Sequence, residues 1–240
     1  MSGPAVILVD PQLGENIGMV ARAMLNCGLT DLRLVRPRDG WPNEKAVSAS
    51  SGADMVVYRA KLFDTTSEAI ADLNRVYAAT ARDRDMTKAV MTPAGAASEI
   101  RAHGTAGTGV IFGGEAKGLK NDDVALADKI LTVPLNPDFK SLNLAQSVLL
   151  VAYEWFKLGD DTPDSHTMTP GTRPANKEEL LGLFEHLEGA LDDSGFMHVR
   201  EKRPIMVRNL RNMLQRAGLT EQEVRTLRGV IKSLTYRRET

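Results

Sequence analysis

The chain of 240 residues has a single cysteine, Cys27, so it cannot form an intramolecular disulfide bond. It has no apolar run of about 18 residues, and so no membrane-spanning helix is expected. The opening Met1–Pro4 places no basic residue ahead of the apolar run Ala5–Val9, and we expect no signal peptide. Together these absences predict a cytoplasmic protein without a membrane partner.

The sequence also lacks the residue patterns of several common sites. Its four histidines are scattered and have no cysteine at ligand spacing, so no zinc or other metal site is expected. There is no Gly-x-Ser-x-Gly segment, which disfavours a hydrolase nucleophile elbow. The glycine cluster Gly113–Leu119 is neither a dinucleotide fingerprint nor a P-loop, and Leu32–Val35 contains no acidic residue for a ribose. A nucleotide-dependent enzyme of the doubly wound type is therefore disfavoured.

Basic residues are concentrated towards the end of the chain. A hydrophobic content of 42% and a charged content of 25% are typical of a globular protein, and the net charge is −1. Residues 200–240, however, hold eleven basic and four acidic residues, a charge of +7, which leaves −8 for residues 1–199. This asymmetry indicates a polyanionic partner, although a solvated helical surface would have the same composition.

Strand and helix patterns alternate over the first two thirds of the chain. Short apolar runs predict strands, and apolar residues three or four apart predict helices. The alternation is typical of an α/β fold with a parallel sheet and helices on both faces. The expected strands are Ala5–Asp10, Asp31–Val35, Asp54–Tyr58, Arg75–Thr80, Gly109–Gly113 and Lys129–Val133. The expected helices are Asn16–Cys27, Asn43–Ala53, Thr66–Leu73, Pro93–Ala102, Asn121–Ala127 and Leu144–Trp155.

A different pattern follows these elements. A stretch rich in Asp, Thr, Ser, Pro and Gly without apolar periodicity predicts a linker. Beyond it we expect three helices, because Asn176 with Glu179 and Thr220 with Glu223 form capping-box patterns, and Pro204 suits a first helical turn. The expected division is a domain at 1–158, a linker at 159–175 and a small all-α extension at 176–240.

Ligands of parallel sheets bind where loops leave the carboxyl ends of the strands. Pro134 and Pro137 stiffen one of these loops, which ends on Ser141 or Asn143, either of which can cap the following helix. The loops that we expect to form a site are Pro11–Gly18, Ala79–Arg84, Gly113–Leu119 and Pro134–Asn143.

Arg22 is a candidate for the chemistry of such a site. The helix that begins at Asn16 has an apolar stripe, and Arg22 lies about 140° around the helix from Ile17, away from that stripe. A solvated surface arginine is one interpretation. The other is an arginine that reaches a phosphate from the start of a helix.

Three short motifs follow one another in the chain, and together they carry more information than any one of them. The motifs are Asn16-x-Gly18-x-x-x-Arg22, Phe112-Gly113-x-Glu115-x-x-Gly118-Leu119 and Ser141-Leu142-Asn143-Leu144-Ala145. Their order resembles that of the SPOUT superfamily of RNA methyltransferases, and most closely the TrmH-like branch that methylates ribose 2′-hydroxyls. The segments Gly195–His198 and Leu227–Val230 resemble the helical extension of the TrmJ group within that branch, so the resemblance spans nearly the whole chain.

The resemblance implies a fold that no pattern argument proposes, an α/β domain with a deep trefoil knot at its C-terminal end. It also implies an obligate homodimer and a cofactor, S-adenosylmethionine, held by the knotted loops without a metal. The Leu144–Trp155 helix is consistent with a dimer, because its other side carries Ala145, Leu149 and Ala152, which need a partner to cover them.

The resemblance also implies roles for individual residues. Gly114 and Glu15 depart from the residues often found at their positions, which puts in doubt how RNA lies in the site. The implied catalytic residues are Arg22, Asn16 and Ser141. The implied cofactor-binding residues are Ala79, Thr80, Ala81, Gly113, Glu115, Val133, Lys140, Ser141, Leu142 and Asn143. The implied RNA-binding residues are Arg22, Arg82, Arg208, Arg211, Arg225 and Arg228.

The function that the resemblance implies is methyl transfer to a ribose 2′-hydroxyl of tRNA, at position 32 of the anticodon loop. Ribosomal RNA or another tRNA position is the alternative, and a catalytically silent RNA-binding module is a further one. Methyl transfer from a sulfonium needs mainly positioning and the removal of a hydroxyl proton. Arg22 either acts as a base after an RNA phosphate takes its proton, or stays charged and stabilises the developing alkoxide; the sequence leaves both open.

Overall fold

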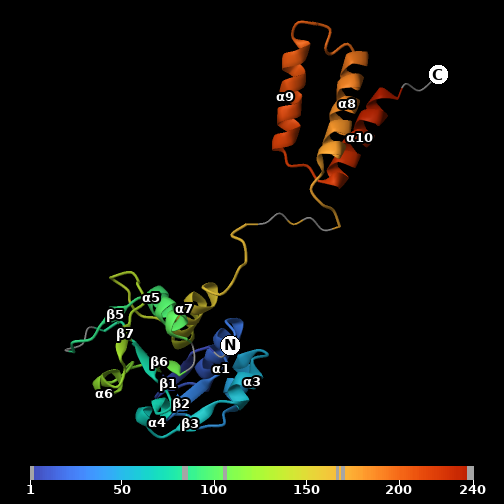
Figure 1. The fold of residues 1–240 in the computed structure, drawn as a ribbon. Helices are drawn as coiled ribbons and strands as arrows, with labels where there is room; N and C mark the ends of the chain where they lie inside the picture. The colour runs from blue at the N-terminus through green and yellow to red at the C-terminus, as the bar shows by residue number, and fades with distance from the viewer. Residues whose placement is uncertain (1–2, 83–85, 105–106, 166–167, 169–170, 237–240) are drawn as a thin grey trace. The chain divides into compact units, whose positions relative to one another are not determined.

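In the part of the chain that the structure describes, seven parallel strands form one sheet (Figure 1). The computed structural model describes residues 3–82, 86–104, 107–165, 168 and 171–236. It forms two units, Met1–Thr162 and Pro163–Thr240, and the sheet belongs to the first. The strand order is β3-β2-β1-β6-β4-β7-β5, and the predicted parallel α/β sheet is confirmed. The strands are β1 (Ala5–Val9), β2 (Leu32–Val35), β3 (Lys61–Phe63), β4 (Arg75–Ala79), β5 (Val90–Met91), β6 (Thr108–Gly113) and β7 (Lys129–Leu131).

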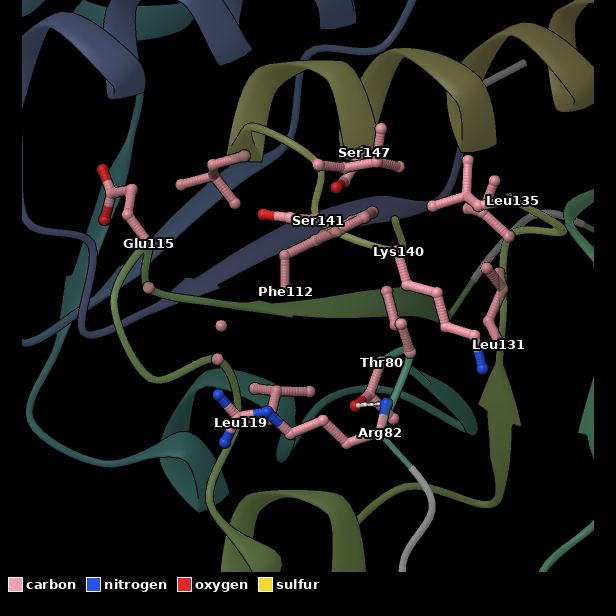
Figure 2. A pocket seen from close by; sticks show the side chains of 18 of the residues that line it. Thr80, Arg82, Phe112, Glu115, Leu119, Leu131, Leu135, Lys140, Ser141 and Ser147 are labelled. Carbon is pink, nitrogen blue, oxygen red and sulfur yellow. Dashed lines mark hydrogen bonds between the residues drawn. The ribbon is translucent and has the colours of Figure 1, made fainter. Parts of the chain in front are cut away.

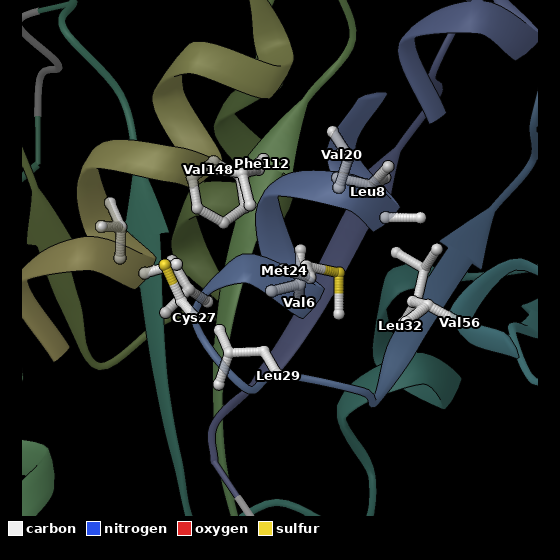
Figure 3. Close-up of a cluster of buried hydrophobic side chains, with 14 of the residues drawn as sticks. Val6, Leu8, Val20, Met24, Cys27, Leu29, Leu32, Val56, Phe112 and Val148 are labelled. Carbon is white, nitrogen blue, oxygen red and sulfur yellow. The ribbon is translucent and has the colours of Figure 1, made fainter. Parts of the chain in front are cut away.

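Helices cover both faces of the sheet, because side chains of a strand alternate between the two faces. On β1, Val6 and Leu8 pack into one core cluster and Ile7 and Val9 into a second. Figure 3 shows part of the first cluster, where Val20 and Met24 of α1 lie over Val6 and Leu8. That cluster is covered by α1 (Gly14–Asn26), α2 (Glu44–Ser50), α3 (Asp54–Tyr58), α5 (Pro93–His103) and α7 (Leu144–Lys157). The second is covered by α4 (Thr66–Ile70) and α6 (Asn121–Ala125).

The strand expected at Asp54–Tyr58 is wrong, since these residues form the helix α3. Val56 and Val57, which are neighbours in sequence, are both buried, whereas Met55 and Tyr58 are exposed. This spacing fits one face of a helix and contradicts the alternation of a strand. The strand that follows, β3, and the two-residue strand β5 were not predicted, because both are short and largely exposed and lack an apolar run.

Outward-facing apolar residues on α7 differ from the expected set. Ala152 was assigned to the uncovered side of this helix, but it is 2% exposed and packs in the core. The exposed apolar stripe consists instead of Leu149, Tyr153 and Phe156, at i, i+4 and i+7. The exposed face of α7 differs from the expected one because two helices, α1 and α5, pack against α7.

The second unit contains three helices in its described part, α8 (Lys177–Asp193), α9 (Arg203–Arg216) and α10 (Glu221–Thr235). Both expected capping boxes are formed, at the starts of α8 and α10. A small core joins these two helices, with Leu183 and Phe184 of α8 against Val224 and Ile231 of α10. No helix among the described residues is long and apolar enough to cross a membrane.

Helix α9 has no fully buried residue; Leu214 packs against the small core, and ion pairs join α9 to α8. Arg211 makes two parallel hydrogen bonds to Glu188, of 2.6 and 2.9 Å, and its guanidinium lies 5.8 Å from the Phe184 ring centroid. Arg203 makes a similar pair with Asp192. Two-pronged arginine–carboxylate contacts fix orientation as well as distance, so they hold α9 in place where apolar burial is small.

Gly18 of the first motif packs two helices together. A Cβ atom at this position would lie 2.2 Å from the carbonyl oxygen of Ala46, on α2, and 2.9 Å from the Cβ of Ala49. Glycine is required here because α1 and α2 approach each other backbone to backbone. The first motif therefore contains a packing residue beside its polar residues.

We expect Gly18→Ala to lower the free energy of unfolding by about 1–3 kcal/mol, because the added methyl group forces α1 away from α2. Alanine is favoured over glycine in helices by about 1 kcal/mol, which opposes the effect. Urea unfolding followed by circular dichroism measures the change. Gly95→Ala in α5 is the matched control, since its Cβ would meet nothing closer than 3.5 Å, and it should keep or raise stability. Equal stability of the two variants would contradict close packing at Gly18.

Candidate active site

A cavity of about 450 Å³ opens at the carboxyl ends of β4, β6 and β7 (Figure 2). Three loops form its walls: the one after β4, the glycine loop after β6, and the one between β7 and α7. Apolar side chains that include Phe112, Leu119, Leu131 and Leu135 supply a surface for a flat apolar group. Nine of the ten residues that the resemblance assigned to a cofactor line it: Ala79, Thr80, Ala81, Gly113, Glu115, Val133, Lys140, Ser141 and Leu142.

The glycine loop after β6 closes on itself. Gly118 N–H donates to the Gly114 carbonyl at 2.9 Å, and the two residues form an antiparallel bridge. A Cβ at Gly113 would lie 2.2 Å from the backbone of Gly118 and Leu119. Gly118 takes φ +64°, which favours glycine. The glycines therefore let the loop fold into a tight ring that forms one wall of the cavity.

Glu115 points out of this ring towards the start of α1. Its carboxylate accepts hydrogen bonds from the backbone N–H of Gln12 at 2.8 Å and of Leu13 at 3.3 Å, and from the Asn16 side chain at 2.6 Å. Leu13, at the N-cap of α1, offers no capping side chain of its own. Glu115 thus caps a helix that lies about 100 residues earlier in the sequence, and its charge is placed favourably at the positive end of that helix.

Asn16 extends this contact to the third motif. The amide of Asn143 donates to Asn16 Oδ1 at 3.2 Å, while Asn143 Oδ1 accepts from Ala145 N–H at 2.8 Å and so caps α7. Of the two expected caps for α7, Asn143 is the one formed, and Ser141 is free to line the cavity. A chain of hydrogen bonds, Glu115–Asn16–Asn143, therefore joins one polar residue from each motif. Asn143 belongs to this chain and does not line the cavity.

The carboxyl group of Glu115 stays ionised at neutral pH. Partial burial would raise its pKa, but the hydrogen bonds from Asn16, Gln12 and Leu13 outweigh that and hold the pKa below the ordinary value of 4.5. A charged acceptor is what the three donors need, because a protonated carboxyl offers fewer acceptor positions.

The arginines expected at the site differ in position. Arg22 is exposed on α1, forms no ion pair among the described residues and does not line the cavity. It lies six residues after Asn16, about 9 Å further along the helix. Arg82 lines the cavity, and its backbone N–H donates to Thr80 Oγ1 at 3.2 Å (Figure 2). Arg208, Arg211, Arg225 and Arg228 belong to the second unit.

Several lining residues were given no cofactor role from the sequence, although Phe112, Gly118, Leu119 and Leu144 stand in the motifs and Gly114 was noted as a departure. Most of them are apolar residues at strand ends or on the inner face of α7, where the sequence pattern does not distinguish a cavity wall from core. The C-terminal end of each expected strand could have indicated these residues, because ligands bind at that edge of a parallel sheet. They are Phe112, Gly114, Ala116, Gly118, Leu119, Leu131, Leu135, Leu144, Ser147 and Val151. Among the described residues, no group of three His, Cys, Asp or Glu side chains has the arrangement of a metal site.

Comparison with known proteins agrees with this architecture. The chain belongs to the SpoU rRNA Methylase family, which it matches over residues 3–153. Residues 178–240 match a second family, the C-terminal domain of tRNA methyltransferase TrmJ. The expectation of a SPOUT-type RNA methyltransferase close to TrmJ is thereby confirmed.

Individual relatives cover nearly the full chain. The tRNA (cytidine/uridine-2'-O-)-methyltransferase TrmJ of Salmonella typhimurium is 35% identical over 238 residues, 95% of each chain. The crystal structure of TrmJ from Z. mobilis ZM4 is 52% identical, with a TM-score of 0.84 over 98% of this chain and 100% of that one. The SpoU methyltransferase AviRb from Streptomyces viridochromogenes, solved with the cofactor AdoMet, has the same fold at 19% identity, with a TM-score of 0.52 over 66% of this chain and 58% of that one.

We expect Glu115→Gln to destabilise the first unit by about 1 kcal/mol, because a helix cap loses its charge. Since the pKa of Glu115 is lower in the folded protein than its ordinary value of 4.5, this stabilisation is complete above about pH 4.5. It is lost as the pH falls through the folded-state pKa. Urea unfolding at pH 7 and in acid measures both.

Glu154→Gln in α7 is the control for this variant, because Glu154 forms no salt bridge among the described residues. It should unfold like the wild type at both pH values. A Glu115→Gln variant whose stability matched the wild type at pH 7 would show that the carboxylate charge does not support α1.

Proposed function

We propose that this protein transfers a methyl group from S-adenosylmethionine to a ribose 2′-hydroxyl of tRNA, at position 32 of the anticodon loop. The observation that carries the proposal is the cavity, two of whose three loops carry the second and third motifs and are joined to the first motif by the hydrogen bonds of Glu115, Asn16 and Asn143. The tRNA 2'-O-methyltransferase relatives, similar over 95% of the chain, support the reaction and the substrate.

The cavity suits S-adenosylmethionine. Its volume of about 450 Å³ is in the range of sites for cofactors and drug-sized ligands, its apolar walls suit an adenine ring, and the ring-shaped glycine loop lets backbone groups approach closely. Lys140 and Arg82 supply positive charge for a carboxylate. When bound, this cofactor supplies an electrophilic methyl group. The residues proposed to hold it are Ala79, Thr80, Ala81, Gly113, Glu115, Val133, Lys140, Ser141, Leu142 and, through its cap of α7, Asn143.

Arg22 is proposed to act on RNA, with Asn16 and Ser141 as the other catalytic residues. Its guanidinium is exposed and unpaired among the described residues, so it is available to a phosphate and to the reacting hydroxyl. Glu115 fixes the start of α1, and with it the direction in which Arg22 projects. Two roles fit this position: a base whose proton an RNA phosphate has taken, or a charged group that stabilises the alkoxide.

The proposal includes a deep trefoil knot and a homodimer. The segment after β7 runs past the glycine loop to place α7 against α1 and α5, which is the course that a knotted C-terminal segment requires. The exposed apolar stripe Leu149, Tyr153 and Phe156 on α7, with Met19 on the neighbouring α1, supplies the surface for a second copy. Exposed apolar side chains that gather on one face mark surfaces for protein–protein contact.

The proposal further assigns tRNA recognition to residues 176–240, after a linker at 159–175. Arg208 and Arg228 form no ion pair among the described residues, so phosphates are the partners that suit them. Among the described residues Arg225 forms one ion pair, with Glu221 one helical turn away at 3.1 Å. This contact is exposed, so a phosphate can replace it at little cost in free energy. Arg211 is engaged with Glu188 and Phe184, so its contribution to RNA is expected to be smaller.

Methyl transfer to tRNA tests the function directly. We expect the purified protein to transfer radiolabelled methyl groups from S-adenosylmethionine to unmodified tRNA, and mapping of 2′-O-methyl groups to place them at position 32. Arg22→Lys should bind S-adenosylhomocysteine normally but lose most of the activity, because lysine lacks the planar fork of donors. Arg59→Lys, an exposed arginine outside the cavity, is the control and should remain active.

Other results would redirect the assignment. Methylation of ribosomal RNA in place of tRNA would favour the alternative substrate, which the family description also names. A folded protein without heat of binding for S-adenosylhomocysteine at millimolar concentration would overturn the methyltransferase assignment. An Arg22→Lys variant with wild-type turnover would remove Arg22 from the mechanism.

Salt dependence tests the assignment of the second unit. Each phosphate contact adds about 0.7–0.9 to the slope of log affinity against log salt. We therefore expect Arg208→Gln with Arg228→Gln to lower that slope by about 1.4–1.8 and to leave cofactor affinity unchanged. Arg59→Gln with Lys61→Gln removes the same charge from the first unit and serves as the control. An unaltered slope in the Arg208/Arg228 variant would show that these helices do not contact phosphates.

A further inference from the structure

Asp10 follows β1 directly and has no part in the motifs. It takes a left-handed backbone with φ +49°, and its neighbour across the sheet, Arg36 at the end of β2, takes φ +48°. Asp10 Oδ1 accepts from Arg36 Nε at 2.8 Å, and Oδ2 accepts from Lys120 Nζ at 3.0 Å. Non-glycine residues in this backbone region are uncommon, and they cluster at functional sites, where the surrounding structure holds them in place.

Both the backbone and the side chain of Asp10 contact the ends of the glycine loop. At one end, a Cβ on Gly114 would lie 2.1 Å from the Asp10 carbonyl oxygen, so the loop rests directly on the Asp10 backbone. At the other end, Lys120 follows Gly118 and Leu119 and reaches the Asp10 carboxylate. The close approach also explains the small residue at position 114, since any side chain there would push the loop off Asp10.

Arg36 holds Asp10 from the opposite side. Its Nη1 donates to the Asp64 carbonyl at 3.0 Å while its Nε holds the Asp10 carboxylate, so the ends of β1 and β2 and the segment after β3 are connected. The carboxylate of Asp10 is 38% exposed and that of Glu115 faces α1, so neither needs to touch a ligand to act on the loop. The two carboxylates therefore hold the same glycine loop through different partners.

We infer that Asp10 is a positioning residue for cofactor binding: with Lys120 and Arg36 it fixes the glycine loop in the shape that forms the cavity wall. This inference rests on the proposed function for the identity of the ligand, and on geometry alone for the loop. Six of the twenty residues that line the cavity come from the loop between Gly113 and Leu119, so any motion of this loop in the free protein opposes binding. The step of methyl transfer itself does not involve Asp10.

Asp10→Asn tests the inference, because asparagine tolerates the left-handed backbone and has nearly the same shape, and only the charge is lost. We expect calorimetry to show about fivefold weaker binding of S-adenosylhomocysteine, the effect expected from losing the partly exposed ion pair with Lys120, which is the one that reaches the glycine loop. The KM for S-adenosylmethionine should rise by a similar factor while kcat at saturation stays at the wild-type value. Lys120→Gln should have the same effect, and the double variant should bind no more weakly than either single one.

Amide hydrogen exchange gives a second measurement that needs no ligand. The Gly118 amide, which donates to Gly114, should exchange about fivefold faster in Asp10→Asn than in the wild type. The control is Asp31→Asn, since Asp31 also bridges two cations, Arg33 and Lys61, but at the amino ends of the strands. It should keep wild-type cofactor affinity and wild-type exchange at Gly118.

The outcomes separate the inference from the proposed function. A wild-type protein that binds no S-adenosylhomocysteine removes the function, and the exchange rate at Gly118 then decides whether Asp10 holds the loop. The inference is overturned if the Gly118 amide of Asp10→Asn exchanges hydrogen at the wild-type rate, or if this variant binds S-adenosylhomocysteine with wild-type affinity. It is also overturned if Asp10→Asn lowers kcat and leaves KM unchanged, or if the effects of Asp10→Asn and Lys120→Gln on affinity add up in the double variant.

Discussion

The contact between Glu115 and the start of α1 is the interaction on which the site depends. Helix α1 begins without a capping side chain of its own, and the carboxylate that caps it comes from the glycine loop. The same carboxylate holds Asn16, and Asn16 holds Asn143 at the start of α7. One charge therefore fixes the glycine loop, the helix that carries Arg22 and the helix that closes the cavity, and the shape of the site is coupled to the stability of the fold.

The two units stabilise their helices in different ways. In the first, helices pack on a sheet through apolar faces, and Gly18 lets two of them approach to backbone contact. In the second, a core of few residues joins α8 to α10, while Arg203 and Arg211 attach α9 through carboxylates. Arginines in such pairs serve the fold, whereas Arg208 and Arg228 form no ion pair among the described residues, and their contact with RNA is a proposal.

Much of the fold followed from local patterns, because apolar periodicity reflects burial on one or two faces. The parallel α/β sheet and the three C-terminal helices with their capping boxes are confirmed. The pattern failed at α3, where two adjacent valines looked like a strand, and at β5, which pairs with β7 despite its exposed sequence. Ala152 was placed on the wrong side of α7 because the helix is covered by two neighbours rather than one.

For the site, the sequence by itself determined which residue types were present and in what order, and this was enough to indicate an RNA methyltransferase. Only the tertiary structure decided which contacts these residues make. Glu115 caps a distant helix and Gly18 is a packing residue, while Asp10 holds the glycine loop although no motif includes it. The physical reason is that the contacts of Glu115 and Asp10 join segments more than 100 residues apart, and the contact of Gly18 joins two separate helices, so spacing along the chain carries no information about them.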